Sequence, residues 1–236
     1  PHHLLDFKEV TEEYTIYHYQ KDCREKIKDI QSRNKTPILV GGTGLYIKAA
    51  LYDYKLSEEK STNTYDNLTN EELYEELKKL DKDIIIDKDN RRRLIRAINY
   101  YKENNESINK NKTNKLLYNV IFIGLTTDRQ VLYDKINKRV DEMISQGLLE
   151  EVKSFYDKGI KSKPLLNAIG YRELYNYLDG NCTKEEAIEK IKQNSRHYAK
   201  RQYTFFNHQL PVVWFETDYN NFNNTIEKVA SYIDSN

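Results

Sequence analysis

Three short apolar runs, each followed by helical periodicity, limit most strongly what this chain can fold into. The runs cover residues 36–40, 118–126 and 211–217. Such runs predict strands of a parallel sheet, and the first is expected to be buried on both faces. Strands that alternate with helices predict an α/β fold. Three strands are few for this much helix, and the chain opens at Pro1 without an initiator Met. We therefore expect further strands in a segment that precedes this sequence.

The helical segments have recognisable start and stop signals. Thr69, Thr127 and Thr183 are each followed three residues later by Glu or Gln. This is the pattern of a capping box, in which both side chains bond backbone N–H groups at a helix start. Helices are expected over about 14–32, 44–54, 70–80, 90–103, 128–145, 148–158, 184–207 and a closing segment that ends near 233, with polar loops at 55–70 and 104–115.

Composition excludes several classes of protein. A chain of 236 residues with 38% hydrophobic residues can form a real core, and its net charge of +1 creates no overall attraction to nucleic acid. Any basic site must therefore be a local patch. Cys23 and Cys182 are the only cysteines, which favours free thiols in a reducing, cytoplasmic compartment. No apolar window has the length of a membrane span, so we expect no membrane partner.

The sequence GGTG at 41–44 joins the first apolar run to a helical pattern. Glycines allow a sharp turn and the close approach of a ligand, and a helix N-terminus favours an anion. Thr43 offers a hydroxyl at this point. The simpler interpretation is a tight strand–helix connection in which Thr43 is only the N-cap. The turn is not a phosphate-binding P-loop, because the pattern G-x-x-x-x-G-K-[ST] is absent from the chain.

Arg129 lies at the second helical position if Thr127 is the N-cap. A cation there opposes the helix dipole, and an anionic partner would compensate this cost. Asp128 is one such partner, and a bound phosphate is the alternative, since the guanidinium fork suits phosphate oxygens.

Two basic segments carry the remaining charge pattern. Arg92, Arg93 and Arg96 share one helix face with no acid between 90 and 97, which suits phosphate contact or an ordinary solvated face. In NSRHYAKRQYTFFNH, at 194–208, Arg196, Lys200 and Tyr203 also share a face, with His197 and Arg201 beside them. Basic residues interleaved with aromatics suit RNA, although the aromatics of such a helix can equally face the core. No spacing of His or Cys residues predicts a metal site.

Taken in order, these motifs are similar to those of the tRNA dimethylallyltransferase (tRNA isopentenyltransferase) family. The matching segments are PHHLLD at 1–6, PILVGGTGLYIKAAL at 37–51, RRLIRAI at 92–98, LTTDR at 125–129, AIGYREL at 168–174 and AKRQYTFF at 199–206. The resemblance implies a P-loop-kinase-like parallel-sheet core, incomplete here, with a helical insertion domain. It divides the chain into core residues 1–54, a tRNA-binding insertion at 55–110, and core with C-terminal helices at 111–236.

The resemblance also implies an activity and a site. The family transfers a dimethylallyl group from dimethylallyl diphosphate to the exocyclic amine of the adenosine 3′ of the anticodon, with Mg²⁺ at the diphosphate. Thr43 and Arg129 resemble the catalytic residues that meet the adenosine and the pyrophosphate, and Gly42, Gly44 and Tyr46 resemble the lining of the reaction channel. Residues that resemble tRNA-contacting segments are Arg92, Arg93, Leu94, Ile95, Arg96, Gly170, Tyr171, Arg172, Lys200, Arg201 and Gln202.

Some expectations follow from where the chain departs from the family pattern. The P-loop and the general-base aspartate of the family lie upstream of PHHLLD, so we expect these 236 residues alone to be inactive. Magnesium would then be bound through the diphosphate and that upstream segment, with no metal ligand here. We expect a monomer that binds the tRNA anticodon stem-loop. A small-molecule kinase of the P-loop class and a non-catalytic RNA-binding module stay open as alternatives.

Overall fold

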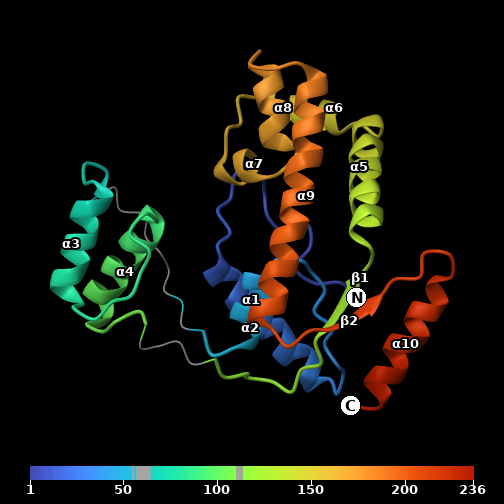
Figure 1. Cartoon of the computed structure of the whole chain (residues 1–236), viewed down its shortest axis with the longest axis horizontal. Coiled ribbons are helices and arrows are strands. Elements are labelled where there is room, and N and C mark those ends of the chain that lie inside the picture. Colours follow the sequence, from blue (N-terminus) through green and yellow to red (C-terminus); the bar gives the residue numbers. More distant parts are fainter. Residues whose placement is uncertain (55, 57–64, 110–113) are drawn as a thin grey trace.

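The computed structural model describes residues 1–54, 56, 65–109 and 114–236. Parts of the two polar loops expected at 55–70 and 104–115 lie outside these residues. The elements in chain order are α1 (Ile16–Ser32), α2 (Gly44–Leu51), α3 (Asn70–Leu80), α4 (Arg91–Asn104), β1 (Ile123–Thr126), α5 (Arg129–Ser145), α6 (Leu148–Asp157), α7 (Lys163–Asn167), α8 (Tyr171–Leu178), α9 (Lys184–Gln209), β2 (Val213–Glu216) and α10 (Phe222–Asp234) (Figure 1).

The sheet confirms the parallel α/β prediction in part. Strands β1 and β2 pair in parallel, with Ile123 opposite Val213 and Thr126 opposite Glu216. The strand expected at 36–40 is wrong: this segment has no strand structure, and Ile38 and Val40 are 85% and 87% exposed. A strand forms only where a neighbour accepts and donates its backbone hydrogen bonds. Within the described residues, β1 and β2 bond only each other.

Three separate apolar cores hold the helices. Helices α3 and α4 share a core around Leu73, Leu77 and Leu94, and they stand apart from the rest of the molecule in Figure 1. Helices α5, α6, α8 and α9 pack around Val152 and Leu174. A third core joins α1, α2 and the C-terminal end of α9.

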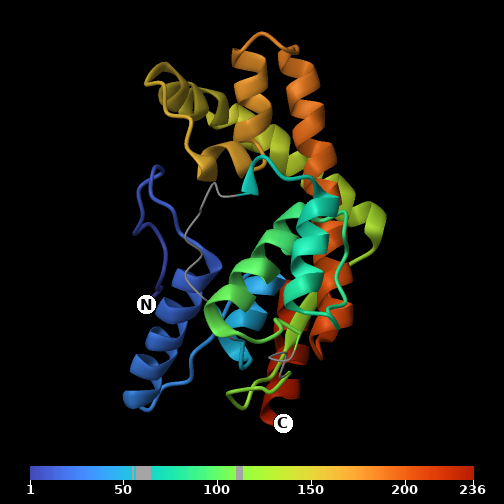
Figure 2. The ribbon, with the colours of Figure 1, turned by 90° about the vertical axis from the view of Figure 1, so that its left-hand side faces the viewer.

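Helix α9 belongs to two of these cores. It connects the bundle of α5, α6 and α8 to the core formed with α1 and α2. It packs against α8 and α5 in its first half and against α2 in its second half. Figure 1 shows it running from the bundle down to α2, and in Figure 2 its lower part passes behind α3 and α4. Its length is 26 residues, about 39 Å at 1.5 Å per residue. The same helix therefore contacts both the turn before α2 and the C-terminal end of β1.

Local capping decides where the helices begin. The capping boxes at Thr69 and Thr183 are confirmed, with both reciprocal hydrogen bonds present. The box expected at Thr127 is wrong. Asp128 is the N-cap of α5, and its Oδ1 accepts from the N–H groups of Gln130 and Val131 at 2.8 and 3.1 Å. A carboxylate offers a charged acceptor that the positive helix end favours over a hydroxyl.

Among the residues that the structure describes, none of the helices combines the length and apolarity that crossing a bilayer requires. Cys23 and Cys182 are both free thiols, as expected.

Candidate active site

One stripe of α9 holds the glycine-rich turn before α2. Tyr198, Gln202 and Phe205 follow the spacing i, i+4, i+7 and therefore lie on one face of the helix. Gln202 Nε2 donates to the carbonyl oxygen of Gly42 at 3.0 Å. Tyr198 Oη lies 3.3 Å from Thr43 Oγ1. The side chains of Gln202 and Tyr198 thus meet two consecutive residues, Gly42 and Thr43.

The three glycines of this segment differ in the space around them, and close packing argues most strongly for glycine at position 44. A Cβ at Gly42 would overlap the amide of Gln202, and a Cβ at Gly44 would overlap the ring of Phe205. Neither glycine has a positive φ. The sequence interpretation was a turn that lets a ligand approach, and the structure shows that α9 makes the close approach. Gly41 has open space where its Cβ would be.

Thr43 occupies the N-cap position of α2, but its hydroxyl makes no cap hydrogen bond. Its backbone carbonyl accepts from the N–H groups of Tyr46 and Ile47, which starts the helix. The side chain is exposed. The N-cap position that the simpler interpretation gave Thr43 is confirmed, but its hydroxyl is not used to cap α2.

The side chain of Tyr46, expected to line a channel, is half-buried. Its ring lies against that of Tyr19 in α1, with centroids 5.0 Å apart, and burial raises the pKa of its hydroxyl. It therefore contributes to the packing of α1 on α2.

Arg129 lies at the first position of α5, three residues after the C-terminal end of β1. It is exposed, its Nε donates to Tyr133 Oη at 3.0 Å, and its guanidinium lies 5.2 Å from the centre of that ring. Asp128 at the N-cap supplies the negative charge that the helix start favours. The position of Arg129 therefore does not by itself demand a bound anion.

Thr43 and Arg129 belong to segments that touch the same stretch of α9. Tyr198 meets Thr43, and Tyr203 Oη lies 2.9 Å from Thr126 Oγ1, three residues before Arg129. Five residues on a helix span about 7.5 Å along its axis. The ring of Tyr203 also stacks on Trp214 of β2, with centroids 5.1 Å apart. Helix α9 thus contacts both the turn before α2, through Tyr198, and the C-terminal end of β1, through Tyr203.

The expected RNA-contacting residues of α4 differ in exposure. Arg92 and Arg93 are exposed at the start of the helix. Leu94 is fully buried, and Ile95 packs against the same core, so their side chains hold the helix in place. Arg96 is half-buried and has interaction partners.

The neighbouring Arg91, which the sequence analysis did not assign, has a structural role. Its guanidinium nitrogens donate to the carbonyl oxygens of Leu68 and Tyr65, both at 2.6 Å. These bonds hold α4 against the segment before α3.

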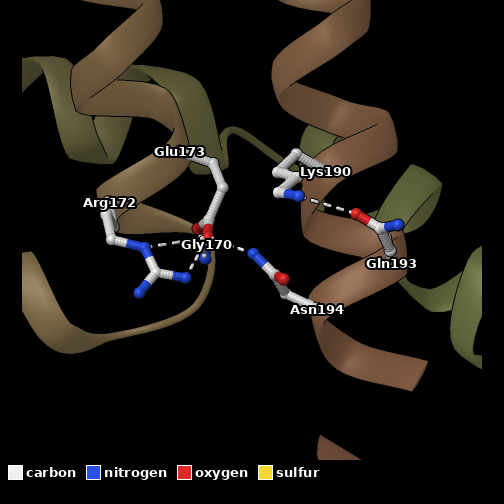
Figure 3. A network of polar contacts seen from close by, with 6 residues as sticks. All are labelled: Gly170, Arg172, Glu173, Lys190, Gln193 and Asn194. Atoms are coloured by element: carbon white, nitrogen blue, oxygen red, sulfur yellow. Dashed lines mark hydrogen bonds and ion pairs between the residues drawn. The ribbon is translucent and has the colours of Figure 1, made fainter. Parts of the chain in front are cut away.

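A buried carboxylate organises the start of α8. Glu173, with only 3% of its side chain exposed, accepts from Gly170 N at 2.8 Å, Arg172 Nη2 at 2.8 Å and Asn194 Nδ2 at 2.7 Å (Figure 3). Burial raises the pKa of this carboxyl, but the hydrogen bonds from Arg172, Gly170 and Asn194 outweigh burial and hold the pKa below its usual value. The sequence signal for this network is Glu at the third helical position, as in a capping box.

The expected RNA-contacting residues of α8 are held by acids. Arg172 is half exposed and paired with Glu173, and Gly170 has a φ of 103° that favours glycine. The hydroxyl of Tyr171 donates to Glu151 of α6. Burial, with this carboxylate, raises the pKa of Tyr171 to about 12.

The basic segment of α9 is divided between solvent and protein. Lys200 and Arg201 are exposed, and so is His197. Arg196 instead donates to Asn137 of α5 at 2.6 Å and pairs with Glu189. The aromatic rings of Tyr203 and the two phenylalanines that follow pack inward, as the core-facing alternative predicted.

Two cavities lie away from Thr43 and Arg129. One, of about 380 Å³, lies between α1 and α4 and is lined by residues that include Arg24 and Tyr100. The other, of about 330 Å³, lies beside the α8–α9 turn. Within the described ranges, no three His, Cys, Asp or Glu side chains gather as a metal site would require.

Comparison with known proteins identifies the family. The sequence model of the IPP transferase family matches residues 1–209. The chain therefore belongs to the IPP transferase family and is a transferase.

Curated relatives of this chain carry the name of one enzyme of this family. The tRNA dimethylallyltransferase of Anoxybacillus flavithermus is 46% identical over 244 residues, which cover 99% of this chain and 78% of the relative. That of Geobacillus thermodenitrificans is 45% identical over 247 residues, with the same two shares.

Solved structures show the same fold. The full-length tRNA isopentenylpyrophosphate transferase of Bacillus halodurans matches with a TM-score of 0.73 at 39% identity, over 100% of this chain and 78% of that one. A eukaryotic dimethylallyltransferase acting on tRNA matches with a TM-score of 0.82 at 25% identity, over 98% of this chain and 63% of that one.

Proposed function

We propose that this protein transfers a dimethylallyl group from dimethylallyl diphosphate to the exocyclic amine of the adenosine 3′-adjacent to the anticodon of tRNA. The names of its relatives support the reaction class. The observation that carries the proposal for this chain is the hydroxyl of Thr43. It is exposed, makes no cap hydrogen bond, and lies on a turn that α9 holds in place.

In the proposed reaction, the adenosine amine attacks the first carbon of the dimethylallyl group. A C–N bond forms, the C–O bond to the diphosphate breaks, and the diphosphate leaves with the electron pair, while the amine passes a proton to a carboxylate base such as the family's general-base aspartate. Thr43 would bond the base and orient it. Arg129 would meet the charge that develops on the leaving diphosphate, where a guanidinium acts most strongly if water is excluded.

Magnesium does not fit the described residues as a ligand set. No cluster of carboxylates stands near Thr43 or Arg129 in the parts of the chain that the structure describes. We therefore assign no step of the reaction to the metal. The roles above belong to this chain's own hydroxyl and guanidinium.

Exposed cations on two elements would bind the RNA. Arg92 and Arg93 on α4, and Lys200 and Arg201 on α9, present their charges to solvent. Each phosphate contact releases counterions, so tRNA affinity should fall steeply with salt. Replacement of Arg92 by Ala should lower the log–log salt slope by about one. A slope unchanged from wild type would remove α4 from the RNA surface.

The reaction is tested with the intact protein, labelled dimethylallyl diphosphate and an anticodon stem-loop. Label should enter the stem-loop that carries adenosine, and a matched stem-loop with inosine at that position should stay unlabelled because it lacks the amine. Phosphoryl transfer from ATP without prenyl transfer would favour a kinase. Binding of the stem-loop without any transfer would favour an RNA-binding module.

Variants test the two roles. Thr43→Ala should lower kcat about tenfold or more with unchanged affinity for tRNA. Thr204→Ala is the control, because its exposed hydroxyl on α9 bonds only the carbonyl of Lys200 among the hydrogen bonds described for it. Arg129→Ala should raise the KM for the diphosphate about tenfold, whereas Arg139→Ala, exposed on the same helix, should not. Unchanged donor kinetics in Arg129→Ala would refute the diphosphate contact.

A further inference from the structure

Tyr198 is a residue that the motifs did not single out. Its hydroxyl lies 3.3 Å from Thr43 Oγ1, although the two residues are 155 positions apart in the chain. Gln202 and Phe205, on the same face of α9, fix the backbone on either side of Thr43. Gln202 and Phe205 thus contact the backbone of the turn, and Tyr198 of the same helix contacts the hydroxyl of Thr43.

The position of Tyr198 is set by its own helix. Ala199 beside it is buried, which anchors this part of α9. The guanidinium of Arg201 lies 5.8 Å from the centre of the Tyr198 ring, within cation–π range. Tyr198 as a whole is 36% exposed, and the pair of hydroxyls is also exposed, so it is open to the solvent from which a substrate would arrive.

The chemistry of the two hydroxyls decides the direction of the bond. A threonine hydroxyl has one donor and two acceptor positions, and it rotates freely unless a partner fixes it. A phenol, with a pKa near 10, is the stronger donor of the two. If Tyr198 donates to Thr43, the proton of Thr43 points away from α9, and one lone pair stays open. A hydroxyl in that state can donate to a ring nitrogen and accept from the adjacent amine of an adenine.

We propose that Tyr198 is a positioning residue that sets the rotation of the Thr43 hydroxyl toward the adenosine. This inference rests on the proposed function. The separation of 3.3 Å is longer than the usual 2.7–2.8 Å between hydroxyls, and bonds of this kind commonly shorten when substrate binds. The effect expected is therefore moderate.

The test is a double-mutant cycle in prenyl transfer to the stem-loop. Tyr198→Phe removes only the hydroxyl and should lower kcat about three- to tenfold, with the KM values for tRNA and donor unchanged. In the Thr43→Ala background, the same change should have no further effect, because the hydroxyl to be oriented is gone. Thr43→Ser retains that hydroxyl and should retain the response to Tyr198→Phe.

The control is Tyr156→Phe, whose hydroxyl donates to Asp179 in the bundle, and its kcat should match wild type. Melting curves should show Tyr198→Phe folded as wild type, since the ring stays in place. A wild-type kcat in Tyr198→Phe, or losses that multiply fully in the double variant, would overturn the role of Tyr198 alone. A wild-type protein that transfers no dimethylallyl group would instead overturn the proposed function and this inference with it.

Discussion

Replacement of Glu173 by Ala should destabilise the helical bundle strongly. The carboxylate is buried and accepts hydrogen bonds from Gly170 N, Asn194 Nδ2 and Arg172. Gly170 is the N-cap of α8, the helix that contains Glu173, and Asn194 lies in α9, so the change removes one cap bond of α8 and one link between α8 and α9. Arg172 is half exposed and can turn to water after the loss.

The magnitude follows from these partners. A hydrogen bond to a charged acceptor contributes about 1.5 kcal/mol or more, so the bonds from Gly170 and Asn194 together contribute about 3 kcal/mol. The pair with half-exposed Arg172 adds less than about 1 kcal/mol. For a chain of this size, about 3 kcal/mol lowers Tm by about 6–12 °C.

Urea denaturation followed by far-ultraviolet circular dichroism measures the loss. The control is Glu189→Ala, since Glu189 is 66% exposed and its pair with Arg196 should contribute less than about 1 kcal/mol. A loss below about 1 kcal/mol in Glu173→Ala, equal to that of the control, would refute the argument that the buried network holds α8 to α9.

The same network predicts a pH dependence. The folded-state pKa of Glu173 lies below its unfolded value of about 4.3, so the unfolded chain binds the proton more readily. Its contribution to stability is present above about pH 4.3 and is lost as pH falls through the folded pKa. The difference in free energy of unfolding between wild type and Glu173→Gln should therefore shrink from pH 6 toward pH 3. A constant difference would mean that the charge of Glu173 is not involved.

Three further substitutions test the packing around the site. Gly44→Ala should lower the free energy of unfolding by about 1–3 kcal/mol, because its Cβ meets Phe205. Gly41→Ala, where the space is open, should change this free energy by no more than about 0.5 kcal/mol. Both are measured by urea denaturation, and equal losses would contradict the packing argument. Asp128→Ala should cost about 1 kcal/mol in thermal melts, since two N–H groups of α5 lose their acceptor, and an unchanged Tm would refute the cap. Arg24→Ala should cost about 2 kcal/mol and speed hydrogen exchange at the end of α2, where Arg24 donates to three carbonyl oxygens; unchanged exchange would contradict this role.

The sequence alone predicted the local features well. Each capping box at Thr69 and Thr183 depends on groups within four residues, so all the hydrogen-bond partners can be read from the local sequence. The start of α5 was harder because Thr127 and Asp128 are adjacent candidates for one cap. Their competition is decided by geometry and charge, and Asp128 makes both bonds.

Strand formation depends on neighbouring strands, which the sequence of the segment itself does not identify. Residues 36–40 have the aliphatic composition of a buried strand, yet Ile38 and Val40 face solvent because no described strand lies beside them. Strands β1 and β2 were both predictable as runs, but the structure shortened each to four residues.

The sequence by itself determined that a turn of glycines around Thr43 stands before a helix, and that Arg129 lies in the first turn of another. Only the tertiary structure decided why glycine is needed at position 44 and what touches Thr43, because the answer is a stripe of α9 about 155 residues further along the chain. Such contacts depend on how helices cross, which local propensity does not encode. The partners of Thr43 became identifiable only when α9 was placed against the turn.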